Sequence, residues 1–176
     1  FDGNNDYIQL PSDFIPNGEF TIEFWVKPQY TSSGGLIFDA SKGDKYFWIA
    51  IYNNHIQFFF EDSQDLDMQF TVSHTFNNNQ WYHVATIGEF NGNTHQIYVD
   101  GTLLSTKNYT TGGKPSFLPP RIGIQTQEYG ASGIPDFNGI IDEFHIWSDA
   151  LSSTEISSIF NDGITGNENN LIGFWD

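Results

Sequence analysis

Short stretches in which apolar and polar residues alternate recur along the whole chain. Each has about the length of a β-strand, and a period of two places every second side chain on the same face of a sheet. About ten short strands with little helical periodicity predict an all-β fold, built as a two-sheet sandwich. The predicted strands are Tyr7–Leu10, Phe20–Val26, Leu36–Asp39, Tyr46–Tyr52, His55–Phe60, Met68–Ser73, Trp81–Ile87, Gln96–Asp100, Arg121–Ile124, Ile140–Trp147 and Leu171–Trp175.

Turn-forming residues separate the predicted strands. Asn53-Asn54 is a candidate two-residue hairpin loop, and Asp100-Gly101 is a candidate tight turn. No break in composition marks a linker, so the 176 residues are expected to form a single domain, 1–176. Segments rich in Gly, Pro, Ser and Thr are predicted loops, and these are Thr31–Gly35, Lys107–Pro120 and Thr126–Asp136.

The segment 138–156 combines a strand with the start of a helix. Strict alternation through Ile140–Trp147 places Asp142 on an otherwise apolar face. The sequence thus predicts a carboxylate that points toward the core and needs a partner, either donor groups or a metal. The period then changes, and Ser152 followed by Glu155 has the spacing of a helix capping box. We therefore expect one brief helix of about one turn.

The strands predicted in the middle of the chain carry an unusual second face. One parity of Tyr46–Tyr52, His55–Phe60 and Met68–Ser73 is purely apolar and belongs to a core. The opposite parity mixes aromatic rings with amide and imidazole groups, whereas a face that met only water would more often carry Lys, Glu, Thr and Ser. The residues of this mixed face are Tyr46, Trp48, Tyr52, His55, Gln57 and Phe59.

Such a face suits a carbohydrate. The C–H faces of a pyranose stack on aromatic rings, and its hydroxyls bond to amide and imidazole groups. We therefore expect the mixed face to bind a glycan. In the alternative interpretation, Lys107–Pro120 or Thr126–Asp136 folds over the face and buries its rings as a second, smaller core. The sequence leaves both interpretations open.

Charge and composition narrow the classes of partner. The chain has 22 acidic and 6 basic residues, a formal net charge of −16, which argues against nucleic acid and anionic membrane surfaces. No apolar run reaches the length that spans a bilayer, so no membrane insertion is expected. Cysteine is absent, which excludes disulfides, thiolate metal sites and cysteine nucleophiles. The start at Phe1, without a leader, is expected for a mature or excised segment.

Several sequence blocks together resemble one family. In chain order they are F-D-G-N-N-D-Y-I at the start, F-T-I-E-F-W-V-K-P at 20–28, W-Y-H-V-A at 81–85, I-Y-V-D-G at 97–101 and G-I-I-D-E-F-H-I-W-S-D-A-L-S-S-T-E-I from 139. Their order and approximate spacing resemble the laminin-G-like, or concanavalin A-like, jelly-roll superfamily over essentially the whole chain. The resemblance implies an antiparallel two-sheet jelly-roll sandwich with one short helix.

The resemblance also implies a function. Members of this superfamily are mostly extracellular modules of larger proteins that bind glycans or proteins, often with a structural calcium ion. We therefore expect a secreted or cell-surface, non-catalytic module of a larger enzyme or adhesin that binds a poly- or oligosaccharide. The alternative is an adhesion module that binds a cell-surface protein. The calcium ligands that the resemblance carries over are Asp2, Asn5 and Asp142; otherwise these side chains only cap turns.

Catalysis is the minority interpretation. Hydrolysis of a glycan needs two carboxylates in one cleft, and related jelly-roll glucanases carry acids at alternating positions of a strand. Here Asp142 and Glu143 are adjacent and are expected to point to opposite faces, which removes that arrangement. His145 shares the face of Glu143, but one such pair is weak evidence for catalysis. Trp81 and His83 are predicted to be structural, and we expect no catalytic residues.

Overall fold

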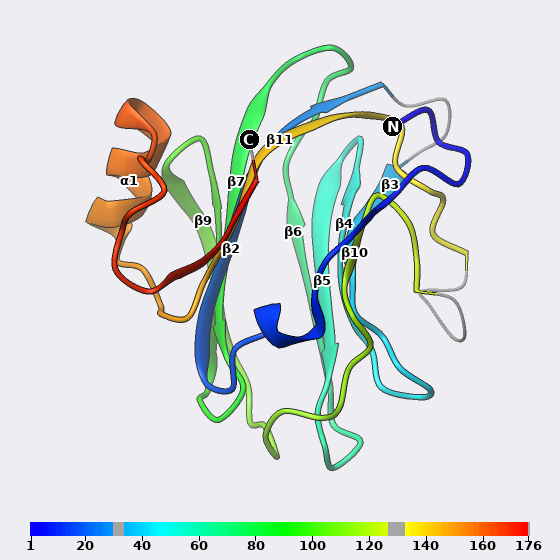
Figure 1. Cartoon of the computed structure of the whole chain (residues 1–176), viewed down its shortest axis with the longest axis vertical. Helices are drawn as coiled ribbons and strands as arrows, with labels where there is room; N and C mark the ends of the chain where they lie inside the picture. The colour runs from blue at the N-terminus through cyan, green and yellow to red at the C-terminus, as the bar shows by residue number, and fades with distance from the viewer. Residues whose placement is uncertain (30–33, 127–132, 176) are drawn as a thin grey trace. The chain divides into compact units, whose positions relative to one another are not determined.

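The computed structural model describes residues 1–29, 34–126 and 133–175 (Figure 1). Within these ranges the chain forms two antiparallel sheets of six strands each and one α-helix, which confirms the predicted all-β class. Contacts within the chain define two compact units. The first unit comprises Phe1–Asp13, Lys27–Gln80 and Gly112–Ile140, and the second comprises Phe14–Val26, Trp81–Thr111 and Ile141–Asp176. The expectation of one domain over residues 1–176 stays a prediction.

The first unit carries the sheet with strand order β1-β10-β3-β4-β5-β6. The predicted hairpin loop Asn53-Asn54 joins β4 to β5, and β3 to β6 follow one another along the chain. Strand β10 comes from much later in the sequence and pairs with β3. The strands are β1 (Ile8–Gln9), β3 (Gly34–Asp39), β4 (Phe47–Tyr52), β5 (His55–Glu61), β6 (Asp67–Ser73) and β10 (Arg121–Ile122).

Alternation decides which face of this sheet is buried. In β5, the side chains of Ile56, Phe58 and Phe60 are buried, and the residues between them are only half-buried. In β6, Met68, Phe70 and Val72 are buried and the intervening residues are exposed. Burying each of these large apolar side chains stabilises the fold by roughly 1.5–3 kcal/mol. The predicted apolar parity is therefore confirmed as the core of the first unit.

The second unit carries the sheet β12-β11-β2-β7-β8-β9, apart from the ends of β2 and β11. In β2, the predicted core residues Phe20, Ile22, Phe24 and Val26 are all buried. The strands are β2 (Glu19–Pro28), β7 (Tyr82–Glu89), β8 (Thr94–Val99), β9 (Thr102–Asn108), β11 (Gly139–Trp147) and β12 (Leu171–Trp175). A 3₁₀ turn, η1 (Ser12–Phe14), precedes β2.

Among the strands of the described residues, β9 is the one that the sequence pattern does not predict. Its residues are mostly exposed and alternate weakly, because it lies at the edge of the sheet and pairs only with β8. The predicted turn at Asp100 and Gly101 joins these two strands, with φ angles of 49° and 71°. Left-handed φ at both positions is the backbone that a tight two-residue hairpin requires. The turn was thus predicted correctly, and the strand after it was not.

Two of the predicted loops fall partly on residues that the structure does not describe. Residues 31–33 of Thr31–Gly35 and residues 127–132 of Thr126–Asp136 lie outside the described residues. Gly34 and Gly35 belong to β3 and are not part of a loop. In Lys107–Pro120, β9 ends at Asn108 and the following residues form neither helix nor strand.

Helix α1 (Ser153–Asp162) begins with the predicted capping box. Ser152 N donates to Glu155 Oε2 at 2.7 Å, and Glu155 N donates to Ser152 Oγ at 3.3 Å. The helix is longer than the predicted single turn, because Ile156 and Ile159 lie on one face and are both buried. It packs beside β9 (Figure 1). No helix among the described residues has the length and apolar character needed to cross a membrane.

Candidate functional site

The mixed face predicted from the sequence forms one continuous patch on β4 and β5, with Tyr46 just before β4. The pairing of β4 with β5 places Trp48 opposite Phe59 and Ala50 opposite Gln57. Tyr52 and His55 flank the hairpin loop at the end of the same two strands. We call the six side chains the aromatic face: Tyr46, Trp48, Tyr52, His55, Gln57 and Phe59.

The rings of the aromatic face are arranged in two stacked pairs. The ring centroids of Trp48 and Phe59 lie 5.4 Å apart at an interplanar angle of 9°, and those of Tyr52 and His55 lie 4.3 Å apart at 13°. Tyr46 meets Phe59 edge-on at 5.8 Å. Four residues of strand separate the two pairs, a distance of about 13 Å. An extended ligand that contacts both pairs is therefore longer than one sugar unit.

A glycine makes room for the second ring pair. Gly34 of β3 lies opposite Tyr52 of β4 in the sheet. A Cβ atom on Gly34 would lie 2.4 Å from Tyr52 Cδ1, which is closer than any real contact. The Tyr52 ring therefore lies over the backbone of its neighbouring strand, a position that any larger residue at 34 would block.

Burial divides the aromatic face into a covered and an accessible part. Trp48 is only 8% exposed, and it forms a small apolar cluster with Leu36 and Ala50. Ile134, from the predicted loop Thr126–Asp136, packs against this cluster. The other five side chains of the face are half-buried. The structure thus contains the second small core that one interpretation expects, while most of the face keeps part of its surface exposed.

The polar groups of the face are uncharged. Burial lowers the pKa of His55, so its imidazole is neutral at pH 7, and Nδ1 lies 2.7 Å from Asn54 Oδ1. Burial also raises the pKa of Tyr52, so its hydroxyl stays protonated. Neutral imidazole, phenol and amide groups both donate and accept hydrogen bonds. The face therefore offers rings and neutral hydrogen-bonding groups side by side.

Strand pairing extends the row of Trp48 and Phe59 with polar residues that the sequence analysis did not single out. Gln69 lies beside Phe59 on β6, and Asp39 lies beside Trp48 on β3. Beyond Asp39 comes Arg121, whose Nε donates to Gln9 Oε1 at 3.0 Å and whose guanidinium lies 4.5 Å from the Tyr7 ring centroid. Alternation shows which face of a strand a side chain occupies, but it does not show which distant strand pairs with it. No sequence signal therefore places Arg121 beside Asp39.

Asp39, which lies between Trp48 and Arg121 in this row, is a structural carboxylate. Its side chain is fully buried and accepts hydrogen bonds from Ser41 and from Thr126, whose N donates at 2.7 Å. Burial raises the pKa of Asp39, and the bonds from Ser41 and Thr126 oppose this rise. Because its oxygens bind Ser41 and Thr126, Asp39 holds these two residues together rather than offering a ligand contact.

The second unit contains a buried polar cluster that the sequence analysis missed. Glu23 on β2 is 1% exposed and binds two imidazoles: His145 Nδ1 lies 2.5 Å from Oε1, and His83 Nε2 lies 2.9 Å from Oε2. Burial alone raises the pKa of Glu23, but the hydrogen bonds from His145 and His83 outweigh it, and the pKa lies below its ordinary value. We call these three residues the Glu23 cluster.

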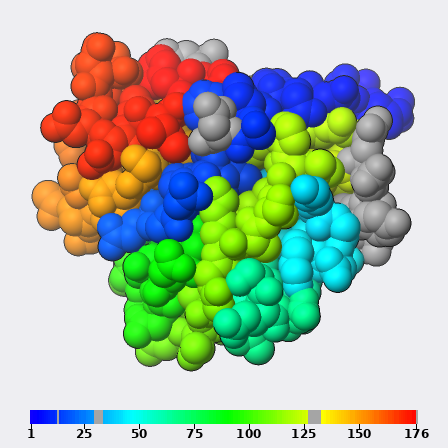
Figure 2. Space-filling view, turned by 60° about the horizontal axis from the view of Figure 1, so that its bottom comes forward, coloured from blue at the N-terminus to red at the C-terminus, as the bar shows by residue number. Residues whose placement is uncertain are grey.

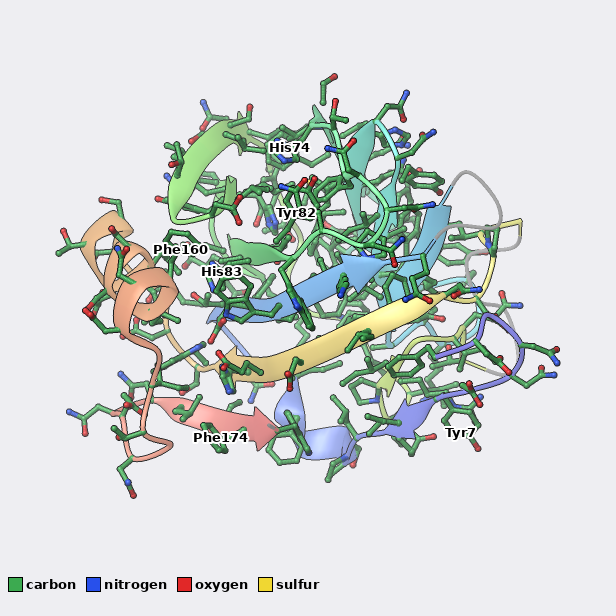
Figure 3. All side chains as sticks on the ribbon, turned by 90° about the horizontal axis from the view of Figure 1, so that it is seen from above. Tyr7, His74, Tyr82, His83, Phe160 and Phe174 are labelled. Atoms are coloured by element: carbon green, nitrogen blue, oxygen red, sulfur yellow. The ribbon has the colours of Figure 1, made fainter. Side chains whose placement is uncertain are left out.

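Aromatic rings cover the two imidazoles of the Glu23 cluster. Phe174 stacks on His145 with centroids 4.8 Å apart, and Phe160 of α1 lies 5.9 Å from His83 (Figure 3). The structural role predicted for His83 agrees with this burial. Glu23 itself carries a sequence signal, since it interrupts the apolar run F-T-I-E-F-W-V, and a buried acid requires partners.

The prediction that Asp142 points into the core is wrong. Asp142 is exposed, and the next residue, Glu143, has a φ of 47°, which breaks the strict alternation of β11. Asp142 and Glu143 both line a shallow pocket together with Trp25 and Trp81. The expected divergence of the two acids across the strand is therefore also wrong, because a left-handed residue resets the direction of the side chains.

The predicted calcium ligands lie in both units. Asp2 and Asn5 belong to an exposed N-terminal loop of the first unit, and Asp142 belongs to the second. In that loop, Asp2 Oδ1 accepts a hydrogen bond from Asn4 N at 2.9 Å, and Asn5 N donates to Asp136 Oδ2 at 3.1 Å. Across residues 1–29, 34–126 and 133–175, no three His, Cys, Asp or Glu side chains gather as a metal site would require.

These features define a β-sandwich of the jelly-roll class with a ring-lined sheet face. A family model described as the Concanavalin A-like lectin/glucanases superfamily, Laminin_G_3, matches residues 2–157. The chain belongs to this family, which confirms the resemblance in the sequence. A search of curated protein sequences finds no match to the chain.

Solved structures share the fold at low sequence identity. The binding domain of botulinum neurotoxin serotype G is 20% identical with a TM-score of 0.70, and the match covers 90% of this chain and 41% of that one. A proposed carbohydrate-binding protein from Bacteroides ovatus is 19% identical with a TM-score of 0.77, over 98% of this chain and 49% of that one. The chain thus spans less than half the length of either protein.

A third structure is similar over most of both chains. It is domain 4 of AbnA, a GH43 extracellular arabinanase from Geobacillus stearothermophilus, in complex with arabinotriose. It is 20% identical with a TM-score of 0.66, and the match covers 92% of this chain and 75% of that one. At these identities the likeness shows the fold.

Proposed function

We propose that the protein is a non-catalytic carbohydrate-binding module that binds a neutral oligosaccharide on the aromatic face. The observation that carries the proposal is the pair of stacks, Trp48 on Phe59 and Tyr52 on His55, with the amide of Gln57 between them. Half-buried rings present apolar surface for the C–H faces of sugar rings, and Gln57 and His55 supply hydrogen bonds to hydroxyls. Trp48 stacks on Phe59 and is itself buried, so the accessible rings are those of the other residues.

Two further considerations support a neutral glycan. The net charge of −16 repels anionic ligands, and the polar groups of the face are themselves uncharged. Among proteins of similar fold, domain 4 of AbnA is solved with arabinotriose, an uncharged oligosaccharide. We infer that the module belongs to a larger extracellular protein, in which it holds the parent protein on a glycan.

The proposal is tested by measuring affinity on a panel of neutral and acidic oligosaccharides by calorimetry. Tyr52→Ala removes one ring of a stack, and we expect it to weaken binding about tenfold, a loss of about 1.4 kcal/mol. Gln57→Ala removes the amide and should weaken binding by a similar factor. The matched control is Trp81→Ala, which deletes a ring that is 37% exposed on the other unit.

Three outcomes separate the alternatives. Loss of affinity in Tyr52→Ala but not in Trp81→Ala supports the aromatic face. Unchanged affinity in Tyr52→Ala and Gln57→Ala, or no binding to any glycan on the panel, overturns the proposal and favours an adhesion module for protein. Release of soluble sugars from a bound polysaccharide on prolonged incubation would contradict the non-catalytic part.

We further propose that calcium stabilises the N-terminal loop. The loop is rich in the carboxylate and amide oxygens that calcium prefers, namely those of Asp2, Asn5 and Asp6, and Asp136 contacts the loop by accepting a hydrogen bond from Asn5 N. The hydrogen bond that Asp2 accepts uses Oδ1, and the bond that Asp136 accepts uses Oδ2, so each leaves the second oxygen of its carboxylate outside that bond. Asp142, the third predicted ligand, belongs to the second unit, so its part in calcium binding is tested separately from that of Asp2 and Asn5.

A further inference from the structure

The second unit carries a shallow pocket that the proposed function does not use. Its lining residues are Trp25 of β2, Trp81 just before β7, and Asp142 and Glu143 of β11. Strand β2 lies between β11 and β7 in the sheet, so the four residues come from neighbouring strands. The volume is about 310 Å³, at the small end of the range for ligand pockets. We call it the tryptophan pocket.

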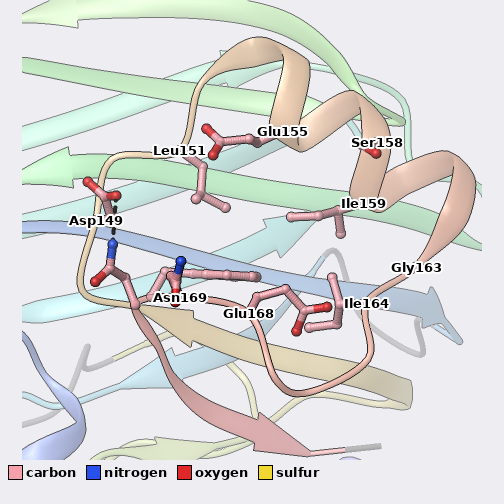
Figure 4. A pocket seen from close by; sticks show the side chains of 11 residues that line it. Asp149, Leu151, Glu155, Ser158, Ile159, Gly163, Ile164, Glu168 and Asn169 are labelled. Atoms are coloured by element: carbon pink, nitrogen blue, oxygen red, sulfur yellow. Dashed lines mark hydrogen bonds between the residues drawn. The ribbon is translucent and has the colours of Figure 1, made fainter.

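A larger pocket beside helix α1 offers less to a ligand. Its walls are the end of β11, the helix, and the segment that follows the helix (Figure 4). In the space-filling view, the residues after α1 lie directly against the helix (Figure 2). The three acids of this pocket, Asp149, Glu155 and Glu168, already accept hydrogen bonds from neighbouring residues. Its carboxylates therefore hold the helix and the following segment in place.

The two acids of the tryptophan pocket have few contacts of this kind. Asp142 Oδ1 accepts a hydrogen bond from Glu143 N at 3.1 Å, and the Glu143 carboxylate accepts none from any described residue. Neither acid forms an ion pair within the part of the chain that the structure describes. The left-handed backbone at Glu143 brings both acids to the same pocket. Two neighbouring carboxylates without a basic partner among the described residues attract a cation.

The two tryptophans supply accessible aromatic surface next to these acids. Trp81 is 37% exposed, and Trp25 is half-buried. The Trp25 ring centroid lies 5.7 Å from that of Phe160 in α1 and 5.5 Å from that of His83, so its neighbours hold the ring in position. Among aromatic side chains, indole attracts a cation most strongly to its ring face. The rings are thus in place before a ligand arrives, which lowers the entropic cost of binding.

The lining of the tryptophan pocket favours positive charge over hydroxyl groups. Apart from the two indole N–H groups, its polar side-chain atoms are all carboxylate oxygens, which accept hydrogen bonds and do not donate them. The aromatic face differs, because it offers a neutral imidazole and an amide, which both donate and accept. A cation that also carries C–H groups fits the tryptophan pocket, since the carboxylates balance its charge and the indole rings contact its carbon atoms.

We propose that the tryptophan pocket binds an organic ammonium group, which lies against the Trp25 and Trp81 rings while Asp142 and Glu143 balance its charge. The group belongs either to a small methylated amine or to a lysine side chain of a partner protein, and both present an ammonium cation on a carbon chain. The net charge of −16 favours the approach of such a cation. The proposal does not depend on the aromatic face being a glycan site.

NMR of the tryptophan indole N–H groups tests the proposal on the full chain. The chain has five tryptophans, and a ¹H–¹⁵N spectrum gives each its own indole resonance, which single Trp→Phe variants assign. The cationic probes are choline and Nα-acetyl-L-lysine methylamide. The matched uncharged probe is 3,3-dimethylbutan-1-ol, which has the shape of choline without its charge. The titrations contain EDTA, because Asp142 is also a predicted calcium ligand.

We expect at least one cationic probe to shift the Trp25 and Trp81 resonances saturably, and 3,3-dimethylbutan-1-ol to leave them in place. Glu143→Gln removes one of the two charges and should weaken the cation about fivefold, whereas Glu19→Gln, an exposed acid at the other end of β2, is the control and should keep the affinity. Trp81→Ala, read at Trp25, should also weaken the cation about fivefold. Added NaCl should weaken binding in the parent protein, because the carboxylates are accessible to salt.

The outcomes identify the source of the cation and separate this proposal from the proposed function. Tighter binding of choline assigns the pocket to a small methylated amine, and tighter binding of the lysine probe assigns it to a partner protein. No shift at Trp25 and Trp81 with either cation overturns the proposal, whatever the aromatic face binds. Equal binding of 3,3-dimethylbutan-1-ol, or equal affinity in Glu143→Gln and the parent protein, contradicts the role of charge. Tyr52→Ala should keep the cation, so a failure of glycan binding on the aromatic face leaves this result unchanged.

Discussion

The aromatic face and the Glu23 cluster use the same kinds of residue in opposite ways. In the Glu23 cluster, both carboxylate oxygens bind imidazole nitrogens, and aromatic rings cover the imidazoles, so nothing is offered to a ligand. In the aromatic face, the rings stack on one another, and His55 and Gln57 keep part of their surface exposed. A mixture of rings and polar groups therefore marks a binding surface only where the polar groups are not already used within the protein.

The largest effect expected from this comparison is on stability. Glu23→Ala removes the carboxylate that both imidazoles bind and should lower the free energy of unfolding by about 3 kcal/mol. Glu19→Ala, an exposed acid on the same strand, is the control and should cost less than about 0.5 kcal/mol. Denaturant unfolding of both variants measures the difference. Equal costs would show that the Glu23 cluster does not stabilise the second unit.

Acid should act on the buried His95 more strongly than on the aromatic face. Burial lowers the pKa of His95 to about 3, so below about pH 6.5 the unfolded chain binds a proton that the folded chain does not. The free energy of unfolding therefore falls as the pH falls, by about 2 kcal/mol between pH 6.5 and pH 5. The lowered pKa of Glu23 acts only below about 4.5 and does not contribute in this window.

Two variants check the assignment to His95. His95→Met, which fills the site with an adaptable apolar side chain, should remove most of the loss between pH 6.5 and pH 5. His55→Gln on the aromatic face should change the loss much less, because His55 is half-exposed. The measurement is the free energy of unfolding as a function of pH. An unchanged slope in His95→Met would assign the acid sensitivity to other groups.

The smallest expected effect is the rise in Tm that calcium causes by binding the N-terminal loop, which belongs to the same unit as the aromatic face. Calcium that binds only the native state at ten times its Kd stabilises the protein by about 1.4 kcal/mol, which raises Tm by a few degrees. Asp2→Asn should reduce the rise. Asp142→Asn distinguishes the ligand sets, because it reduces the rise only where Asp142 takes part. No rise in millimolar calcium, and no metal in the untreated protein, contradicts the proposal.

Much of the fold follows from local pattern in the sequence. Alternation placed eleven strands, and it identified the apolar parity of β4, β5 and β6, because a strand with one buried face must repeat every two residues. The Ser152–Glu155 capping box and the Asp100-Gly101 turn are local signals with a direct physical cause, and both were predicted correctly. The edge strand β9 lacks a buried face and therefore lacks the signal.

The candidate site depended more on tertiary structure. Alternation names the six residues of the aromatic face, because their parity is a local property. It does not reveal that Trp48 is buried, that Ile134 packs against the cluster to which Trp48 belongs, or that Glu23 is enclosed by two histidines from other strands. Asp142 is the clearest case in which alternation fails. The left-handed backbone at Glu143 shifts the parity of β11, so the Asp142 side chain is exposed, although strict alternation assigns it to the core.

The sequence by itself thus determined the all-β class, the superfamily and the membership of the aromatic face. Each of these depends on residues close together in the chain or on the order of short blocks. The tertiary structure alone decided which rings are covered and which acids are paired. These properties depend on contacts between strands far apart in the chain, which form only when burial of the two sheets brings them together.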